Sequence, residues 1–402
     1  MRLYLTALNP TDAVLDGFLP AAARLGLPVT VLTDQPTNWP DLPGVTLTGA
    51  DVRDVRAIVD VVQSAEPPTA LLSNSDHLQT PTALATDYLG LPGKDWRATL
   101  RCKDKRLTRR TLADAGLDTV AAVALGPDDG PDLARALPFP AVVKPREGVA
   151  SEDVYLVADR ADLRRRVTEI RDRRPRLPLL VEEYLAGDLH TLETFGDGRI
   201  LTVLGGWRTE LGPPPTFVEA ALDWVPELPP SVAEQVLAQL AALGVGFGAC
   251  HTEFVVADGR ARIVEVNYRL IGDRMDLVLA ELLDVPLFEY VIRVHAGETL
   301  SSPAAPGLPR PDPLRVDRHA RVEYVCADRS GTLVAAPDRL DVVTPDDVRL
   351  GIRPLRQLGV SAPLSRTNRD YLAVLHAIGP DAGSASRALR DLRAAHRWEI
   401  TG

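Results

Sequence analysis

The chain has 402 residues, 45% of them hydrophobic, with a formal net charge of −10, and its length allows two or three domains with sizeable cores. The acidic balance and the lack of any lysine- or arginine-rich run exclude nucleic acid as an expected partner, and no apolar run is long enough to cross a membrane. The three widely spaced cysteines exclude a disulfide framework and a zinc site, and with a start too short for a signal peptide they predict a cytoplasmic protein.

The first 98 residues alternate short apolar runs with helical patterns, which is typical of a small α/β domain built on a parallel sheet. No glycine-rich dinucleotide-binding motif occurs within this alternation. The expected elements are, in chain order, strand 3–7, helix 13–25, strand 29–33, helix 57–65, strand 70–73 and helix 81–89.

The middle of the chain mixes helices and buried strands. Residues 104–115 have a helical pattern that ends at Gly116, because glycine readily adopts the left-handed conformation that closes a helix. The other expected elements are strands 120–125, 141–144, 154–157 and 179–184 and helices 164–173 and 231–243.

Lysine is rare: only four of the 45 basic residues are lysine, namely Lys94, Lys103, Lys105 and Lys144. A compact ammonium can approach a phosphate as a point charge, which a planar guanidinium cannot do in the same way, although chance is the alternative explanation. Lys144 ends an expected strand, and the backbone N–H groups of the loop 145–153 after it can bind phosphate oxygens. This segment is not a P-loop, since no Gly-Lys-Ser/Thr sequence opens a helix there.

Residues 251–269 carry the strongest chemical signal in the sequence. Apolar and β-branched runs on both sides of residues 257–259 predict a β-hairpin. We expect a three-residue Ala-Asp-Gly loop in which Gly259 takes the left-handed position. Such a loop sets the register that brings Glu253 to the same face as Glu265.

Side chains alternate between the two faces of a strand, so Glu265, Asn267 and Arg269 share one face, and Glu253 joins them through the expected loop. These hard oxygen ligands beside an arginine suit Mg²⁺ that carries phosphates. A solvated hairpin face is the alternative, but apolar residues flank each acid, and buried carboxylates are costly unless they are paired or bound to metal. The sequence therefore predicts a metal–phosphate site.

Beyond residue 300 the pattern changes. Residues 301–313 contain five prolines and few apolar anchors, which indicates a linker or an extended crossing. Strands near 321–326 and 371–378 and a helix near 385–395 then predict a smaller α+β portion.

The chain carries two lysines, a loop, an acidic strand and a hairpin, in that order. This arrangement resembles the ATP-grasp superfamily of carboxylate–amine ligases. The resemblance covers residues 89–297 and is most similar to the L-amino-acid (dipeptide) ligases. The motifs that carry it are Leu91-Pro-Gly, Asp104-Lys105, Pro140-Ala-Val-Val-Lys-Pro, Val181-Glu-Glu-Tyr-Leu, Phe217-Val-Glu, His251-Thr-Glu and Glu265-Val-Asn-Tyr-Arg269.

The resemblance implies a multidomain fold of the α/β and α+β classes. A small parallel α/β domain would occupy residues 1–98. An ATP-grasp domain over 99–300 would clasp ATP between two α+β lobes, with the nucleotide lobe at about 116–186. A C-terminal α+β extension would cover 301–402.

The resemblance also implies roles for single residues. ATP phosphates would meet the lysines and the loop that follows the second lysine, namely Lys105, Lys144, Gly148 and Ser151. Adenine and ribose would meet Glu182, the backbone of Glu183, Leu185 and, near the ribose, His190. Two Mg²⁺ ions, which Mn²⁺ can replace, would be bound by Glu253, Glu265 and Asn267. Arg269 would meet the substrate carboxylate or acyl phosphate.

Two departures from the family pattern prevent a transfer of substrate identity. The Gly-His pair that often follows Phe217-Val-Glu219 is missing, and Leu270-Ile-Gly272-Asp replaces a double glycine after Arg269. We expect Asp273 to cap a helix that starts near Arg274, which would direct Arg274 toward the site, although an ordinary cap is the alternative. Glu219 is a candidate general base, with a structural acid as the alternative interpretation.

The implied activity is an ADP-forming carbon–nitrogen ligase that joins a small carboxylate, such as an amino acid, to an amine through an acyl phosphate. The partners would be small molecules, and the resemblance allows a homodimer. One alternative is another ATP-grasp enzyme of the siderophore, secondary-metabolite or carboxylase type. The other is a regulatory protein that binds ATP without turnover, against which the full set of lysines, acids, amide and arginine argues.

Overall fold

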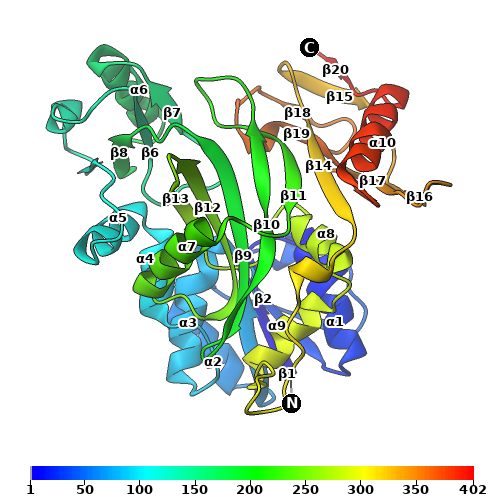
Figure 1. Cartoon of the computed structure of the whole chain (residues 1–402). Helices are drawn as coiled ribbons and strands as arrows, with labels where there is room; N and C mark the ends of the chain where they lie inside the picture. The colour runs from blue at the N-terminus through cyan, green and yellow to red at the C-terminus, as the bar shows by residue number, and fades with distance from the viewer. Residues whose placement is uncertain (1) are drawn as a thin grey trace.

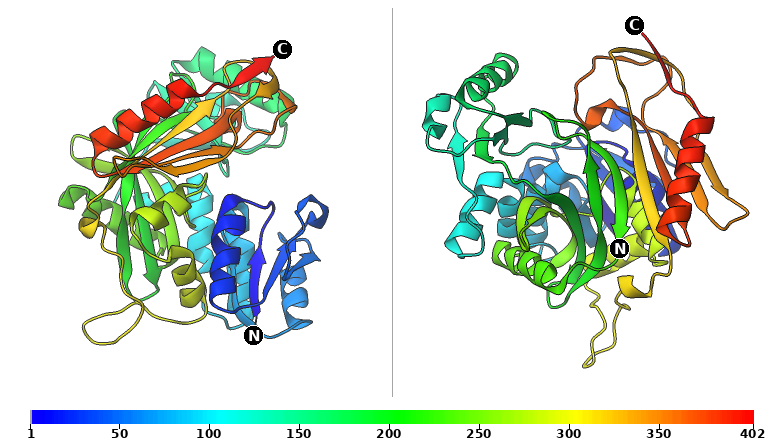
Figure 2. Two further views of the ribbon diagram at one scale, coloured as in Figure 1. Left: turned by 90° about the vertical axis from the view of Figure 1, so that its right-hand side faces the viewer. Right: turned by 45° about the horizontal axis from the view of Figure 1, so that its top comes forward.

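The computed structural model describes residues 2–402 and contains four β-sheets, shown in Figures 1 and 2. The N-terminal sheet is parallel, with strand order β3-β2-β1-β4, and it confirms the expected α/β class. Its strands are β1 (Arg2–Thr6), β2 (Val29–Thr33), β3 (Val45–Gly49) and β4 (Pro68–Ser73). Strand β3 was not predicted from the sequence. A π-helix (Ala13–Phe18) and the helices α1 (Leu19–Arg24) and α2 (Val55–Gln63) connect strands of this sheet, and α3 (Gln79–Tyr88) follows β4.

The order of this sheet has a consequence for ligand binding. Strands β2 and β4 lie on opposite sides of β1, so the chain reverses its direction of winding there. In open parallel sheets, ligands bind outside the carboxyl ends of the strands at such a point. The loops after β1 and β4 are therefore placed at a potential binding edge.

Two helices lead from this domain to a small antiparallel sheet. Helix α4 (Trp96–Lys103) is followed by α5 (Lys105–Asp114), which begins because the Asp104 side chain accepts hydrogen bonds from the N–H groups of Arg106 and Leu107. Gly116 takes the expected left-handed φ of 69° after the helix. The sheet has the order β5-β8-β6-β7 and is covered by α6 (Arg160–Arg173). Its strands are β5 (Ala122–Leu125), β6 (Ala141–Pro145), β7 (Tyr155–Val157) and β8 (Leu179–Glu183).

A nine-stranded antiparallel sheet forms the centre of the molecule (Figure 1). Its order is β13-β12-β9-β10-β11-β14-β19-β17-β16, so it runs across residue 300 and joins the C-terminal portion to the centre through the β11–β14 pair. The strands are β9 (Asp188–Asp197), β10 (Leu201–Leu211), β11 (Glu219–Val225), β12 (Phe247–Ala257), β13 (Arg260–Asn267), β14 (His319–Cys326), β16 (Leu340–Val343), β17 (Arg349–Pro354) and β19 (Tyr371–Gly379). The long strands β9 to β11 were not predicted.

Helices cover this sheet and leave one face of the β12–β13 hairpin for the cleft. Helix α7 (Pro230–Leu243) ends at Gly244, which has a φ of 89°, and its apolar side chains pack on Phe254 and Ile263 of the hairpin. The remaining elements are α8 (Met275–Leu282), α9 (Leu287–His295), α10 (Ala382–Ala395) and a three-stranded sheet of β15 (Gly331–Ala335), β18 (Ser361–Ala362) and β20 (Glu399–Thr401). In Figure 2, α10 lies across the C-terminal strands, on the far side of the molecule from the N-terminal sheet. Across residues 2–402, none of the helices has the length and apolar character needed to cross a membrane.

Candidate active site

The β12–β13 hairpin turns through two residues, not three. Ala257 pairs with Arg260, and Asp258 and Gly259 between them have φ values of 52° and 72°. Positive φ at both central positions is typical of a type I′ turn, for which Asp-Gly is a favoured sequence. The three-residue loop expected from the sequence is therefore wrong.

A β-bulge nevertheless aligns the two acids. Phe254 pairs with Ile263, whereas Glu253 pairs with Glu265, so Val264 is an extra residue on β13. Directly opposed residues share a face of the sheet. Glu253 and Glu265 therefore lie side by side on the face away from α7, as predicted, although the bulge rather than the turn produces the alignment.

Strand β9 extends this polar face. Glu193 of β9, His251 of β12 and Asn267 of β13 form one row of paired residues, and the His251 Nδ1 lies 2.8 Å from Glu193 Oε1. The other ring nitrogen, Nε2, lies 3.4 Å from Glu253 Oε1. Burial lowers the pKa of His251, but the charges of Glu193 and Glu253 outweigh it and raise the pKa to about 10. His251 is therefore an imidazolium that holds Glu253 in place.

Sequence reasoning did not single out Glu193, because the strand that carries it was not recognised.

The hairpin acids form a region of concentrated negative charge. Glu253 Oε1 accepts a hydrogen bond of 3.3 Å from the Asn267 amide, and Glu265 Oε1 lies 2.9 Å from the Lys105 ammonium. Burial, followed by the charge of Glu253, raises the pKa of the nearby Glu219 to about 8. Within residues 2–402, no three His, Cys, Asp or Glu side chains gather as a metal-binding group. Two carboxylates with an amide oxygen fit Mg²⁺, which usually takes one or two protein carboxylates and completes its shell with water and phosphate oxygens.

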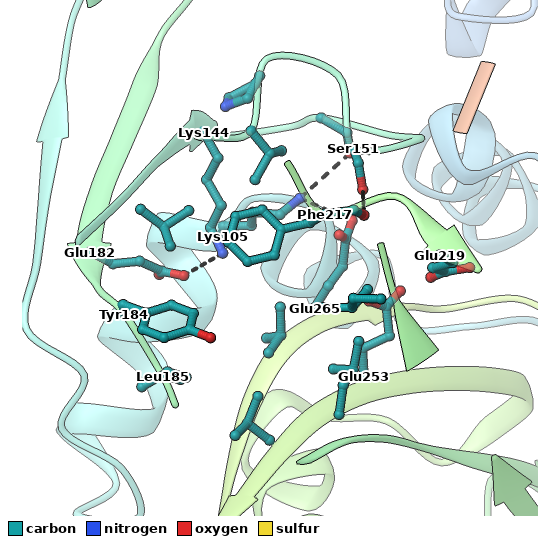
Figure 3. Close-up of a pocket in the computed structure, with 18 of the residues that line it drawn as sticks. Lys105, Lys144, Ser151, Glu182, Tyr184, Leu185, Phe217, Glu219, Glu253 and Glu265 are labelled. Carbon is teal, nitrogen blue, oxygen red and sulfur yellow. Dashed lines mark hydrogen bonds and ion pairs between the residues drawn. The ribbon is translucent and has the colours of Figure 1, made fainter. Parts of the chain in front are cut away.

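A cavity of about 130 Å³ separates the small sheet from the hairpin (Figure 3). Lys105 and Lys144 lie at one side of it, and apolar side chains line much of the rest. Gly148, Ser151, Glu182, Glu183 and Leu185 also line this cavity. The structure thus brings together the residues that the ATP-grasp resemblance assigns to the nucleotide, with the exception of His190.

Lys144 and Glu182 belong to a buried charge network. The Lys144 ammonium contacts Glu182 Oε1, and Arg109 binds the same carboxylate with two nitrogens, at 2.9 and 3.2 Å. Burial raises the pKa of Glu182, but Arg109 and Lys144 outweigh it and lower the pKa to about 2. The Glu182 carboxylate therefore positions Lys144. Sequence reasoning missed Arg109, although it lies four residues after Lys105 on the same predicted helix.

His190 does not face this cavity. It pairs with Phe254 across β9 and β12, and the two rings stack with centroids 6.1 Å apart on the helix-covered face of the sheet. The neighbouring Leu189 lines the cavity instead. The expectation that His190 lies near the ribose is therefore wrong, because adjacent residues of a strand point to opposite faces.

The loop after β6 closes over the cavity and is held from two sides. Ser151 Oγ donates a hydrogen bond of 2.9 Å to the carbonyl of Phe217, and the carbonyl of Ala150 accepts one of 3.1 Å from the N–H of Asn368. Ala150 and Ser151 have left-handed φ values of 56° and 54°. Non-glycine residues in this region are a feature of ligand-binding loops.

Three cavities form a continuous series through the cleft. A second cavity of about 260 Å³ contains Glu219, Glu253, Glu265, Asn267 and Arg269, and it shares the three glutamates and part of the loop with the first. A third, of about 800 Å³, shares Arg269 with the second and opens toward the loops after β1 and β4. Segments 353–357 of the C-terminal portion complete its wall.

Arg274 lies on the wall of the third cavity, but it is not directed by a helix cap. Its φ of 69° is left-handed, it is itself the first flanking residue of α8, and no side chain caps that helix. The expectation that Asp273 acts as the cap is therefore wrong. Arg274 Nη1 instead lies 3.0 Å from Asp16 Oδ2 and 3.7 Å from Asp12 Oδ2.

The comparisons with known proteins agree with this architecture. No protein-family model matches the chain. It is 28% identical over 326 residues to the uncharacterized protein y4rH of Sinorhizobium fredii (strain NBRC 101917 / NGR234), a match that covers 77% of the chain and 64% of the relative. The chain thus spans slightly less than two thirds of the length of this curated relative.

Solved structures match over the whole chain. The L-amino acid ligase from Bacillus licheniformis has a TM-score of 0.82 at 21% identity, covering 100% of this chain and 99% of that one. The phosphoribosylglycinamide synthetase from Anaerococcus prevotii has a TM-score of 0.69 at 14% identity, with coverages of 100% and 99%. The biotin carboxylase domain of the Hydrogenobacter thermophilus 2-oxoglutarate carboxylase, bound to MgADP, ADP and bicarbonate, has a TM-score of 0.70 at 16% identity, with coverages of 100% and 91%. The chain therefore has the ATP-grasp fold that its motifs resemble.

Proposed function

Given this fold, we propose that the chain is an ATP-dependent, ADP-forming ligase that joins a small carboxylate to an amine through an acyl phosphate. The observation that carries the proposal is the continuous series of three cavities. It leads from Lys105 and Lys144, past Glu253, Glu265 and Asn267, to Arg269 and a large cleft of mixed charge. Such a series suits a nucleotide, its phosphates and an acceptor arranged in a line. Fold alone would not carry this proposal, because one fold serves many reactions.

The nucleotide occupies the first cavity. Lys105 and Lys144 bind phosphate oxygens beneath the loop that contains Gly148 and Ser151, and Leu185 and the β8 backbone contact adenine. Both lysines are buried and ion-paired with glutamates, so their ammonium groups are held in fixed positions before the phosphates arrive. Phosphoryl transfer depends mainly on positioning and charge neutralisation, which this arrangement supplies.

The metal-binding residues are Glu253, Glu265 and Asn267. These residues would hold Mg²⁺, one or two ions, which would neutralise phosphate charge when bound. The Nδ1 of His251 contacts Glu193, and its Nε2 contacts Glu253. His251 therefore orients Glu253 in the way that outer-shell partners orient metal ligands.

Arg269 stabilises the acid substrate and its acyl phosphate. Its side chain lies at the junction of the second and third cavities, and Nη1 donates a hydrogen bond of 2.7 Å to the carbonyl of Leu270, which fixes its direction. Carboxylates do not react with amines unaided, because an oxide is a poor leaving group. When the terminal phosphoryl group of ATP is transferred to the carboxylate, the leaving group becomes phosphate instead of oxide. The amine can displace phosphate.

Nucleotide product analysis tests the proposal. The purified chain is incubated with ATP and Mg²⁺ together with pooled amino acids, pooled small carboxylic acids, or bicarbonate. We expect ADP and phosphate only when an acid and an amine are both present. AMP and pyrophosphate would contradict the mechanism, ADP release with bicarbonate alone would favour a carboxylase, and ATP binding without turnover in any pool would favour a regulatory role. A homodimer belongs to the same proposal, and light scattering tests it.

A further inference from the structure

Asp273 stands out among the acids of the large cavity, because the others are neutralised or covered. Arg353 binds Asp12 through two hydrogen bonds, at 3.1 and 2.5 Å, and the Lys103 ammonium contacts Asp76. Asp276 is only 1% exposed, and its Oδ1 accepts the N–H of Leu277. Asp273 is exposed to the cavity, and no basic group within residues 2–402 forms an ion pair with it.

The position of Asp273 relates it to the reacting atoms. Its side chain lines both the large cavity and the smaller cavity that contains Glu253, Glu265 and Arg269. Arg269 lines the same two cavities, so Asp273 lies beside the connection between the large cavity and the acid substrate at Arg269.

The backbone of this segment is fixed in an unusual conformation. Asp273 and Arg274 have consecutive left-handed φ values of 52° and 69°, which cost about 1–2 kcal/mol for each non-glycine residue. The conformation is held by a hydrogen bond of 3.0 Å from the N–H of Met275 to the carbonyl of Gly272 and by the Arg274–Asp16 ion pair. Surroundings that enforce such strain are most frequent at functional sites. The cap that would otherwise explain an aspartate here is missing.

From this position and this lack of a partner, we infer that Asp273 binds the ammonium group of the amine substrate and accepts the proton that the amine loses. The inference rests on the proposed ligase function and identifies a catalytic residue for its second step. The substrate class is a primary amine that is protonated in solution, such as an amino acid or a diamine.

The proposed step balances. The ammonium first gives one proton to the Asp273 carboxylate. The nitrogen lone pair then forms the C–N bond as the bond between the carbonyl carbon and the phosphate oxygen breaks, and phosphate leaves with that electron pair. The second proton of the nitrogen leaves to water or phosphate as the amide forms.

The surroundings of Asp273 suit a proton acceptor. Burial within the cleft raises the pKa of Asp273 above the ordinary value of an aspartate, while the charges of Arg269 and His251 oppose this rise and that of Asp12 adds to it. A higher pKa makes a carboxylate a better proton acceptor near neutral pH. Glu219 is less suitable for the amine, because it lines the nucleotide cavity and the metal-binding cavity but not the large one.

A change of nucleophile tests the inference. Hydroxylamine is already uncharged at neutral pH, so it can attack an acyl phosphate without a residue that binds and deprotonates an ammonium. We would measure ADP release by Asp273→Asn with pooled amino acids, and hydroxamate formation by the same variant with pooled amino acids and excess hydroxylamine. Asparagine keeps the size of the side chain and tolerates the left-handed backbone.

We expect Asp273→Asn to lose about 10²-fold or more of its amide-forming activity, as is typical for a lost general base, while hydroxamate formation stays near the wild-type rate. Retained hydroxamate formation also shows that the variant is folded and activates its acid. Asp284→Asn is the matched control, since Asp284 also has a left-handed φ, of 49°, but lies exposed at the other end of α8.

Equal losses in both assays, or no loss in either, would overturn the role of Asp273. A wild-type chain that forms no hydroxamate with any acid would instead contradict the proposed ligase function, and the inference with it. The two failures are therefore distinguishable.

Discussion

The nucleotide end and the substrate end of the cleft are built in different ways. At the nucleotide end, the lysines and most of the acids of the cavity lie within short sequence motifs, and residues 187–219 complete the wall. At the substrate end, the wall combines loops of the N-terminal sheet, residues 269–276 and residues 339–357. The ion pair between Arg353 and Asp12 joins residues that are 341 positions apart. The first end can be recognised from motifs, whereas the second exists only after folding.

The largest effect is expected at the centre, where both ends meet. Glu265→Gln should lower kcat by about 10² to 10³-fold, because it removes a metal-binding charge and the ionic partner of Lys105 where phosphate charge develops. Steady-state ADP release measures the loss, and thermal unfolding should show a melting temperature near that of the wild type. Glu298→Gln, which removes an exposed partner of Arg293, is the control. Collapse of the fold in Glu265→Gln would mean that Glu265 is a structural acid.

A change at the nucleotide end should weaken ATP binding. Lys144→Met should weaken ATP binding about 10- to 100-fold, the equivalent of a lost charge-assisted hydrogen bond worth about 1.5–3 kcal/mol. The buried Glu182 keeps its two hydrogen bonds from Arg109, so the protein should still fold. Isothermal titration calorimetry with a non-hydrolysable ATP analogue measures the change. Unaltered affinity would show that Lys144 does not contact phosphate.

A change at the substrate end should instead alter KM for the acid or amine and leave ATP affinity unchanged. Asp12→Asn removes the carboxylate that holds Arg353, so this guanidinium group loses its fixed position, whereas Arg274 keeps its closer ion pair with Asp16. We expect KM for the acid or amine to rise about tenfold, or ~1.4 kcal/mol, with ATP affinity unchanged. Asp34→Asn, which breaks the exposed pair with Arg53, is the control. A parallel loss of ATP affinity would mean that the two ends are not independent.

The contrast between the two ends also explains what the sequence could and could not predict. Helix α5 was predicted because its signals are local: Asp104 caps its start and Gly116 follows its end. The lysines and hairpin acids were recognised for the same reason. Strands β9 to β11 were missed because their cleft-facing residues, such as Thr191 and Glu193, are polar and disguise the pattern of buried strands.

For His190 and Asp273, a difference of one residue position makes the predicted role wrong. His190 was assigned to the nucleotide, but the cavity-facing residue is Leu189, and a shift of one residue in a strand reverses its face. Asp273 was interpreted as a cap because an aspartate before an apolar helix usually is one. Arg353 and Arg109 have no motif that connects them to Asp12 and Glu182, since those contacts depend on the packing of distant elements.

The smallest effect is expected for a substitution in the hairpin turn, which should lower stability without lowering activity. Gly259→Ala should cost about 1 kcal/mol in the free energy of unfolding, because alanine at a φ of 72° is strained although no neighbouring atom crowds it. Gly130→Ala is the matched control, since Gly130 has an ordinary φ of −75° and is equally uncrowded. Urea unfolding and steady-state kinetics measure both variants.

Activity should survive in Gly259→Ala because the bulge at Val264, rather than the turn, pairs Glu253 with Glu265. The strain therefore falls on the turn, which four residue pairs separate from the acids. If kcat fell together with stability, the turn would control the register after all, and the alignment of the metal-binding residues would depend on the same loop that the sequence first suggested.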